Sequence, residues 1–382
     1  MDRYISESAE IAVIQQKGMG MKRFLNKYLL ISATAVSVLS QGEGAIATSI
    51  PEAQNFPDAI NEPVDPVTFP HNTSDSAATP QLAQDPLPTD YRIPALQRDN
   101  AGNLWVGTWL GNIARINPQT GNVNARINVP SQTVEALAQD TAGQLWVGTY
   151  TGLMRVNPQT SQITAQPIAL PPASRVLSLT TDSRGFLWVG TDAGLTMVNP
   201  NEETVMTTLL DLPGTSANVM QVDNDGRLWV GTLTGLVEVD TASAFTGRVI
   251  ADIPGQTVQA IALDAQGNLW VGTPAGLAVV DPAFGEVTRF VGAMDGQNVL
   301  SLAFDGNQAL WVGTQEGLYS MNPYNGEILG QAHGLPGRRI LSISPDTGEK
   351  IWVGTNEGLG WVSSTTGRAL PLEGLVNPMM LQ

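Results

Sequence analysis

The sequence contains no cysteine and only two histidines, His71 and His333, among its 382 residues. Without cysteine the chain has no disulfide bonds, thiolate nucleophile or cysteine-ligated metal. A histidine-based mechanism would depend on His333, because His71 lies in a segment that we interpret below as a linker. We therefore expect no catalytic residues, no metal site and no cofactor.

Positive charge is also scarce. The chain carries 19 basic and 35 acidic residues, a net charge of −16, and Lys350 is the only lysine beyond residue 47. Removal of residues 1–47 would leave 14 basic and 31 acidic residues, a net charge of −17. Such a surface keeps a protein soluble and repels phosphate backbones and anionic lipid headgroups. The charge thus argues against nucleic acids and membrane surfaces as partners.

Long hydrophobic runs are missing as well. The apolar stretch from Tyr28 to Leu39 is too short to span a bilayer comfortably. Three basic residues precede it within 22–27, and the small residues Ala45-Ile46-Ala47 follow it. This order predicts a secretory signal peptide over residues 1–47, cut after Ala47, with translation starting at Met1 or Met21. We expect a periplasmic or secreted protein with no membrane span after cleavage.

Residues 48–90 differ in composition from the rest of the chain. They hold eight prolines and seven carboxylates but no lysine or arginine. This composition predicts a disordered, acidic, proline-rich linker. A tether that binds a partner is the alternative.

A nearly constant pentapeptide, Leu/Ile-Trp-Val-Gly-Thr, occurs seven times in the following residues. Its tryptophans are Trp105, Trp146, Trp188, Trp229, Trp270, Trp311 and Trp352, and they recur every 41 or 42 residues. A fixed period of this length indicates one structural unit stacked on copies of itself.

The third copy shows what each unit contains. Strand-like segments at residues 176–181, 186–191, 195–198 and 204–210 are separated by turn sequences. Four short strands in about 41 residues are typical of a propeller blade. We predict an all-β, seven-bladed β-propeller with four antiparallel strands per blade over residues 91–375, followed by a tail at 376–382. Because the copies begin and end in phase, the seventh blade should be one continuous segment.

Further positions recur in every copy. An aspartate stands six residues before each tryptophan, at Asp99, Asp140, Asp182, Asp223, Asp264, Asp305 and Asp346. We interpret these aspartates as structural caps of backbone N–H groups in a turn, and the tryptophans as side chains packed between blades. The glycine that follows the aspartate is shifted in the last two copies, to Gly306 and Gly348, so their turns should differ. Four residues before each aspartate the side chain is small, as expected where innermost strands converge.

The pattern Asp-x-x-Gly-x-Leu-Trp-Val-Gly-Thr-x-x-Gly-Leu resembles the two-component regulator propeller repeat. That resemblance implies a periplasmic sensor module of the kind found in hybrid histidine kinases. The first copy departs from it, with Gly111-Asn112-Ile113 in place of Gly-Leu, and we expect no kinase within this chain, which ends at Gln382. Residues 112–118 also resemble blades of virginiamycin B lyase, an enzyme class that relies on histidine and a divalent metal.

Candidate binding residues lie where the copies differ, in the loops that enter the innermost strands and in the loops between the second and third strands. Arg92, Arg175, Arg338, Arg339 and His333 form a partly basic set that could bind an anion. Alternatively, these arginines pair with carboxylates such as Glu135. Trp109 and Tyr150, with Leu233, could form an apolar patch for a protein or glycan, or could simply pack within their loops.

These observations favour an exported, non-enzymatic binding or scaffold propeller whose partner is a protein or a small anionic or glycan ligand. A ligand-sensing propeller that docks onto a separate sensor kinase is one alternative. A lyase or hydrolase similar to virginiamycin B lyase is the other, and it would need His333 or paired carboxylates at the channel mouth.

Overall fold

The computed structural model describes residues 90–377, except residues 130–132, 165–166 and 365. The predicted signal peptide, nearly all of the predicted linker and residues 378–382 lie outside the described residues. The described residues all belong to one compact unit, Asn55–Gln382.

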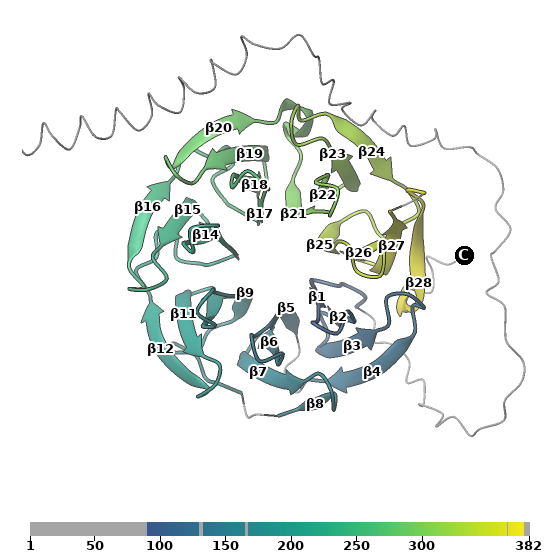
Figure 1. Cartoon of the computed structure of the whole chain (residues 1–382), viewed down its shortest axis with the longest axis horizontal. Helices are drawn as coiled ribbons and strands as arrows, with labels where there is room; N and C mark the ends of the chain where they lie inside the picture. Colours follow the sequence, from purple (N-terminus) through teal and green to yellow (C-terminus); the bar gives the residue numbers. More distant parts are fainter. Residues whose placement is uncertain (1–89, 130–132, 165–166, 365, 378–382) are drawn as a thin grey trace, which may run out of the picture. The chain divides into compact units, whose positions relative to one another are not determined.

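Seven four-stranded antiparallel sheets follow one another around a ring in chain order (Figure 1). Blades one and two comprise β1 Ala95–Arg98, β2 Leu104–Gly107, β3 Asn112–Ile116, β4 Val123–Asn128, β5 Val134–Gln139, β6 Leu145–Thr149, β7 Gly152–Asn157 and β8 Gln162–Ile163. Blades three and four comprise β9 Val176–Thr181, β10 Leu187–Thr191, β11 Gly194–Asn199, β12 Thr204–Leu209, β13 Val219–Val222, β14 Leu228–Thr232, β15 Gly235–Val239 and β16 Thr246–Ile250.

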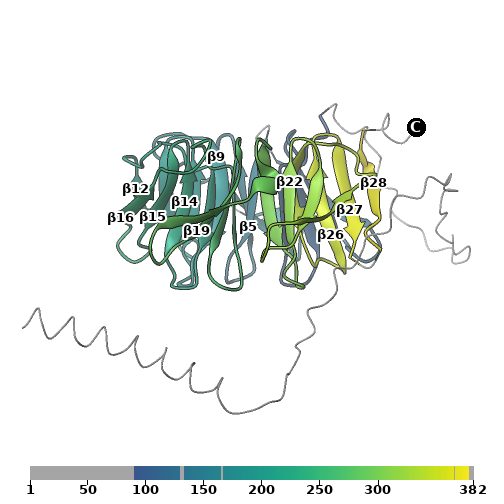
Figure 2. The same ribbon diagram turned by 90° about the horizontal axis from the view of Figure 1, so that it is seen from above.

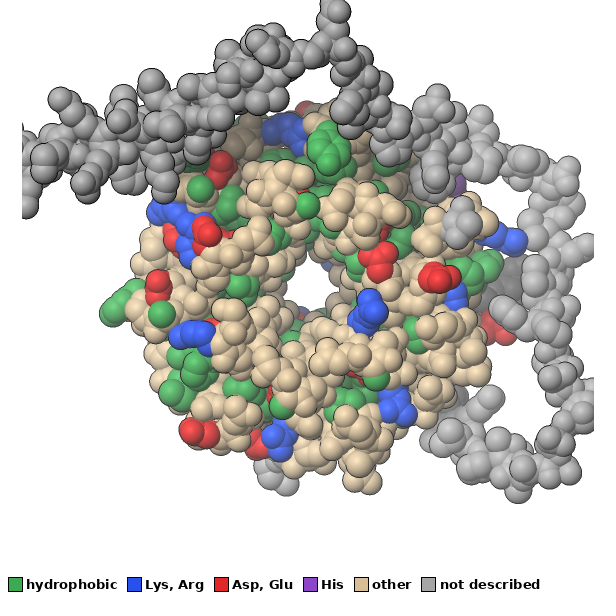
Figure 3. Space-filling view, viewed as in Figure 1, with side chains coloured by type: hydrophobic (Ala, Val, Ile, Leu, Met, Phe, Trp, Pro, Cys, Tyr) green, Lys and Arg blue, Asp and Glu red, His purple; other side chains and the backbone are tan. Residues whose placement is uncertain are grey.

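Blades five and six comprise β17 Ala260–Leu263, β18 Leu269–Thr273, β19 Gly276–Asp281, β20 Glu286–Phe290, β21 Val299–Phe304, β22 Leu310–Thr314, β23 Leu318–Met321 and β24 Ile328–Ala332. Blade seven comprises β25 Ile340–Ser344, β26 Lys350–Thr355, β27 Gly358–Ser363 and β28 Ala369–Val376. A short 3-10 helix, η1 Gly292–Met294, precedes β21. The strands run between the two faces of the ring (Figure 2). The first strand of each blade is the innermost (Figure 1), and the centre of the ring is hollow (Figure 3).

The predicted seven-bladed, all-β architecture is therefore confirmed. In the third blade, β9 to β12 begin and end within one residue of the predicted segments. Blade seven is built from one continuous segment, as expected from the phase of the copies.

The repeated aspartate does more than cap its turn. In blades one to six, one carboxylate oxygen accepts the N–H of the residue four positions later, and the other accepts the indole N–H of the blade's tryptophan at 2.8–3.1 Å. The tryptophans themselves are buried, with Trp311 the most exposed at 5%. A buried indole N–H needs an acceptor, and the aspartate supplies it at the point where two blades pack.

Blade seven breaks this rule, so the prediction that Asp346 caps its own turn is wrong; its carboxylate instead accepts the N–H of Gly306 in blade six at 2.6 Å. Asp346 is exposed, and the indole of Trp352 donates instead to the carbonyl oxygen of Thr347 at 2.9 Å. The expected difference in the turn of blade six is also wrong. Asp305 bonds as in blades one to five, and Gln308 takes the left-handed conformation (φ 64°) that glycine occupies there.

The glycine of the pentapeptide sets the spacing between blades. A Cβ on Gly272 would lie 2.5 Å from Cγ1 of Val299, the buried residue that begins β21 in the next blade. The small residue of the innermost strand lies opposite this glycine in every blade, as Ala260 does to Gly272. The small size of this innermost-strand residue thus matters for the contact with the next blade, and not only for the convergence of the innermost strands at the axis of the ring.

The ring closes by the same contacts that join other blades. The N–H of Ile93 donates to the carbonyl of Thr355 at 3.0 Å, as Val134 does to Thr108 between blades one and two at 3.2 Å. The hydroxyl of Ser342 in β25 also donates to the carbonyl of Ile93 at 2.9 Å. Blade one therefore follows blade seven as any blade follows its predecessor.

Cations add a second link between blades. Five of them lie over their own blade's tryptophan ring at 5.0–5.9 Å, namely Arg115, Arg155, Arg248, Arg289 and Lys350. Each also bonds to the next blade's turn between its third and fourth strands. In blade six the residue opposite Trp311 is Ser320, and the two side chains line a small cavity.

Replacement of one repeated aspartate tests its role in the core. Asp140→Ala leaves the indole N–H of Trp146 and a turn N–H without acceptors, so it should lower the free energy of unfolding by about 3 kcal/mol. Asp346→Ala is the matched control, because Asp346 occupies the same sequence position but does not contact its tryptophan. It loses an exposed hydrogen bond to the N–H of Gly306, so it should cost about 1 kcal/mol. Urea denaturation measures both, and equal losses would contradict the assignment.

The spacing role of the glycine is tested by a double-mutant cycle. Gly272→Ala should destabilise the protein by about 2 kcal/mol, because the added methyl overlaps Val299. In a Val299→Ala background the same change should cost at least 1 kcal/mol less, about the coupling expected for residues in contact. Additive costs in thermal or urea unfolding would show that the two residues do not meet.

Candidate functional site: a groove and an arginine cluster on one face of the ring

The two sets of loops that the sequence singled out do lie on one face. The backbone N–H groups of Trp109, Asp192, Gln315 and Asn356, from loops between second and third strands, donate to residues just before the innermost strands. The acceptors are the carbonyls of Arg92, Arg175, Asn298 and Arg339, at 3.0–3.2 Å. We call this surface the entry face.

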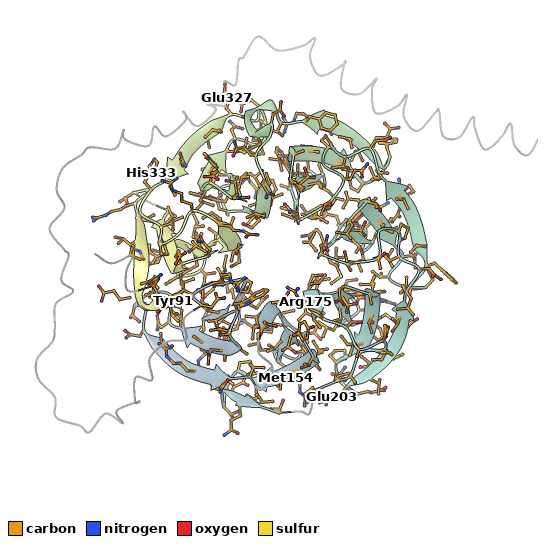
Figure 4. All side chains as sticks on the ribbon, turned by 180° about the vertical axis from the view of Figure 1, so that it is seen from behind. Tyr91, Met154, Arg175, Glu203, Glu327 and His333 are labelled. Carbon is orange, nitrogen blue, oxygen red and sulfur yellow. The ribbon has the colours of Figure 1, made fainter. Side chains whose placement is uncertain are left out.

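Arg92, Trp109 and Arg175 come together on the entry face. The guanidinium carbon of Arg92 lies 4.0 Å from the centre of the Trp109 ring, and that of Arg175 lies 5.4 Å from it. Trp109 is half-buried, so it belongs to this arginine cluster and not to an open apolar patch. Figure 4 shows Arg175 beside the central hollow.

Both arginines also pair with carboxylates, which was the alternative expectation for them. Arg175 Nε lies 2.5 Å from a carboxylate oxygen of Glu135, whose side chain is buried. Arg92 Nε donates to both oxygens of Asp90 at 2.9 Å, and its Nη2 donates to Asp90 as well. These hydrogen bonds from Arg92 hold the pKa of Asp90 below its usual value.

A polar groove opens beside this cluster, where blade seven meets blade one. It has a volume of about 360 Å³ and is lined by Asp90, Tyr91, Arg92, Asn356, Glu357 and Asn377. Glu357 accepts hydrogen bonds from the side-chain amides of Asn356 at 3.1 Å and Asn377 at 3.0 Å. Asn356 in turn accepts the backbone N–H of Arg339 at 3.2 Å. The groove therefore has one guanidinium, two carboxylates and two amides around one space of ligand size.

The other predicted site residues are not members of the arginine cluster formed by Arg92, Trp109 and Arg175. Arg338 and Arg339 are exposed before β25 and form no ion pair with a described residue. Tyr150 is 62% exposed on blade two, and Leu233 is 50% exposed on blade four. His333 is exposed after the outermost strand β24, at the periphery of the ring (Figure 4).

Sequence reasoning missed four groove residues, Asp90, Tyr91, Glu357 and Asn377. Asp90 was assigned to the linker, although its position two residues before Arg92 could have suggested a local ion pair. Glu357 lies in the loop between the second and third strands of blade seven, one of the loops in which the copies differ, so a residue-by-residue comparison of these loops could have found it. Asn377 lies beyond the last predicted strand, and nothing in the repeat pattern points to it.

Within the described ranges, no three histidine, aspartate or glutamate side chains gather in a way that could hold a metal ion. The same part of the chain has no helix of the length and apolar character that crossing a membrane requires.

The chain matches the sequence profile of the family described as "Two component regulator propeller" in five segments: residues 86–110, 128–151, 170–193, 211–234 and 252–275. These segments fall on the first five repeats. No curated protein sequence matches the chain.

Among solved structures, the extracellular domain of a putative hybrid two-component system from B. thetaiotaomicron has a TM-score of 0.62 and 20% identity. That match covers 72% of this chain and 40% of the other, so the chain spans less than half of that relative. A catalytically inactive variant of virginiamycin B lyase from Staphylococcus aureus, solved with quinupristin, has a TM-score of 0.59 and 15% identity, with 69% and 92% covered. At these identities the likeness concerns the fold alone.

The Asp90–Arg92 pair makes a pH-dependent prediction. In Arg92→Gln the pKa of Asp90 should rise, because the hydrogen bonds from the guanidinium that lower it are lost while the burial that raises it remains, whereas Arg175→Gln should leave it unchanged. Because the folded-state pKa is depressed, the pair stabilises the fold above the unfolded-state pKa, and this contribution is lost as pH falls through the lower folded-state value. Carboxyl chemical shifts followed by NMR during acid titration measure both variants, and an Asp90 curve identical to wild type in Arg92→Gln would disprove the assignment.

Proposed function

We propose that this chain, which carries the repeats of the two-component regulator propeller family, is an exported, non-enzymatic binding module that takes a small hydroxylated carboxylate, such as an acidic sugar, in the groove on its entry face. The observation that supports this most is the groove itself. Its lining is mainly polar, it has the volume of a small-ligand site, and its Arg92 guanidinium lies over the ring of Trp109.

The lining residues fit this class of ligand. Arg92 uses Nε and Nη2 on Asp90, which leaves Nη1 to donate to a ligand carboxylate. The carboxylates of Asp90 and Glu357 can accept from ligand hydroxyls, and the second N–H of the Asn356 amide can donate to the ligand. The backbone N–H of Arg339 donates to the side chain of Asn356, which orients that amide at the groove. A simple inorganic anion would leave the two carboxylates without a function.

A ligand in this groove would contact the first and the last blade together. Binding would then add to the free energy that closes the ring, and thermal stability would report it directly. A change at the seam on binding is also what a sensing module needs, because the ligand favours one arrangement of the two end blades.

A sensing role, in which the propeller passes its ligand state to a separate membrane kinase, is the second candidate. The repeat family and the fold shared with the extracellular domain of a hybrid two-component system favour it. A lyase or hydrolase role receives less support, because His333 lies at the periphery and away from the groove. His333→Ala should leave ligand binding unchanged.

The binding role is tested by thermal shift and calorimetry with D-glucuronate as the probe and D-glucose as the uncharged control. Glucuronate should raise the melting temperature and glucose should not. Arg92→Ala and Glu357→Ala should each weaken glucuronate binding about tenfold or more, since each removes a charged hydrogen-bonding group.

Arg126→Ala is the matched control, because Arg126 is an exposed arginine on β4, the outermost strand of blade one. Its affinity for glucuronate should equal that of wild type. Equal responses to glucose and glucuronate, or full binding by Arg92→Ala, would refute the proposal.

A further inference from the structure

A second surface lies on the outer edge of blades four to six. It is formed by the turns between the third and fourth strands and by the fourth strands, whereas the entry face is formed by other loops. Six of the ten large hydrophobic side chains that are exposed in the described part of the chain occur there. They are Phe245, Val249, Phe284, Phe290, Tyr324 and Ile328, and we call them the outer arc. Each of the three blades supplies one aromatic residue from the turn before its outermost strand and one apolar residue from that strand.

The aromatic rings of the outer arc are unusually open. Phe245 is 74% exposed, Phe284 is 75% exposed and Tyr324 is 74% exposed. The outermost strands β16, β20 and β24 succeed one another around the ring (Figure 1), so the three turns belong to neighbouring blades. Blade one shows the contrast, because the exposed positions of its outermost strand β4 are Asn124, Arg126 and Asn128.

Two arginines hold the aromatic turns in place. Arg248 of β16 donates to the carbonyls of Pro282 and Ala283, both at 2.9 Å, in the turn that carries Phe284. Arg289 of β20 donates to the carbonyl of Pro323 at 2.7 Å and to that of Tyr324 at 2.9 Å. Phe284 and Tyr324 thus stand on turns that are fixed to the preceding blade, which lowers the entropy lost on binding.

The charge around the outer arc is negative. Arg248 is fully engaged, since its Nε pairs with Glu238 at 2.6 Å while its two Nη atoms bond to carbonyls. Arg289 gives both Nη atoms to carbonyls. The exposed carboxylates Asp240, Glu286 and Glu327 form no salt bridge with a described residue.

We propose that the outer arc is a docking surface for a cationic, amphipathic segment of a partner protein. The exposed rings are suited to bind the apolar face of such a segment. The carboxylates of Asp240, Glu286 and Glu327 are suited to bind its basic face. A second copy of this acidic chain would bring like charges together, and an anionic lipid surface would be repelled. The proposal is independent of the groove on the entry face.

The test uses a synthetic amphipathic helix of leucine and lysine as the probe, and the corresponding leucine–glutamate helix as its control. Fluorescence anisotropy with the full chain at physiological salt should show binding of the leucine–lysine helix about tenfold tighter or more than that of the leucine–glutamate helix. The double substitution Phe284→Ser with Tyr324→Ser should weaken this binding about tenfold.

The matched variant is Tyr150→Ser with Leu233→Ser, which removes two comparably exposed hydrophobic side chains outside the outer arc and should bind like wild type. Both double variants should melt with wild type, because their side chains are exposed. Undiminished binding by the Phe284 and Tyr324 variant, or no preference for the lysine helix, would overturn the proposal. So would a concentration-dependent dimer that this variant abolishes, since the surface would then be an interface between copies.

Discussion

The hydrogen bond between a buried indole and the aspartate six residues before it is the interaction on which the ring depends. It ties the turn between the first two strands of a blade to the tryptophan that packs against the next blade. One side chain therefore completes a turn and fixes a core residue at the same time. The glycine that lets blades approach recurs in every blade, this hydrogen bond in six, and the cation that reaches the next turn in five, so the seams share most of their contacts.

The repeat also explains how far the sequence could predict the molecule. Blade number, strand order and the strands of blade three follow from a period of 41 residues and from turn residues between apolar runs. The errors came where local pattern and local structure diverge. Asp346 has the same spacing from its tryptophan as the other six aspartates, yet in blade seven the indole N–H of Trp352 donates to the carbonyl of Thr347. Gln308 adopts a conformation for which glycine was expected. Spacing alone does not report backbone conformation.

The candidate site was harder to predict for a different physical reason. Arg92 and Trp109 could be placed on one face because they occupy equivalent loops of a repeating unit. The groove depends on Asp90 and Asn377, which lie outside the repeat, and on the meeting of the first and last blades. A comparison between copies cannot reveal a feature that exists once. The seam between the first and last blades carries side chains that occur only once in an otherwise repetitive ring. It is therefore a better place for a binding site than a position that all seven blades share.

Amide hydrogen exchange with and without D-glucuronate tests most directly whether a ligand binds at the seam between blades seven and one. The N–H of Ile93 bonds to Thr355 across the seam, and those of Val134 and Ala217 make the equivalent bonds elsewhere, to Thr108 and Thr191. Ligand in the groove should slow exchange at Ile93 and at Trp109, whose N–H bonds to Arg92, and leave Val134 and Ala217 unchanged. Uniform slowing in all blades, or no slowing at Ile93, would contradict binding at the seam.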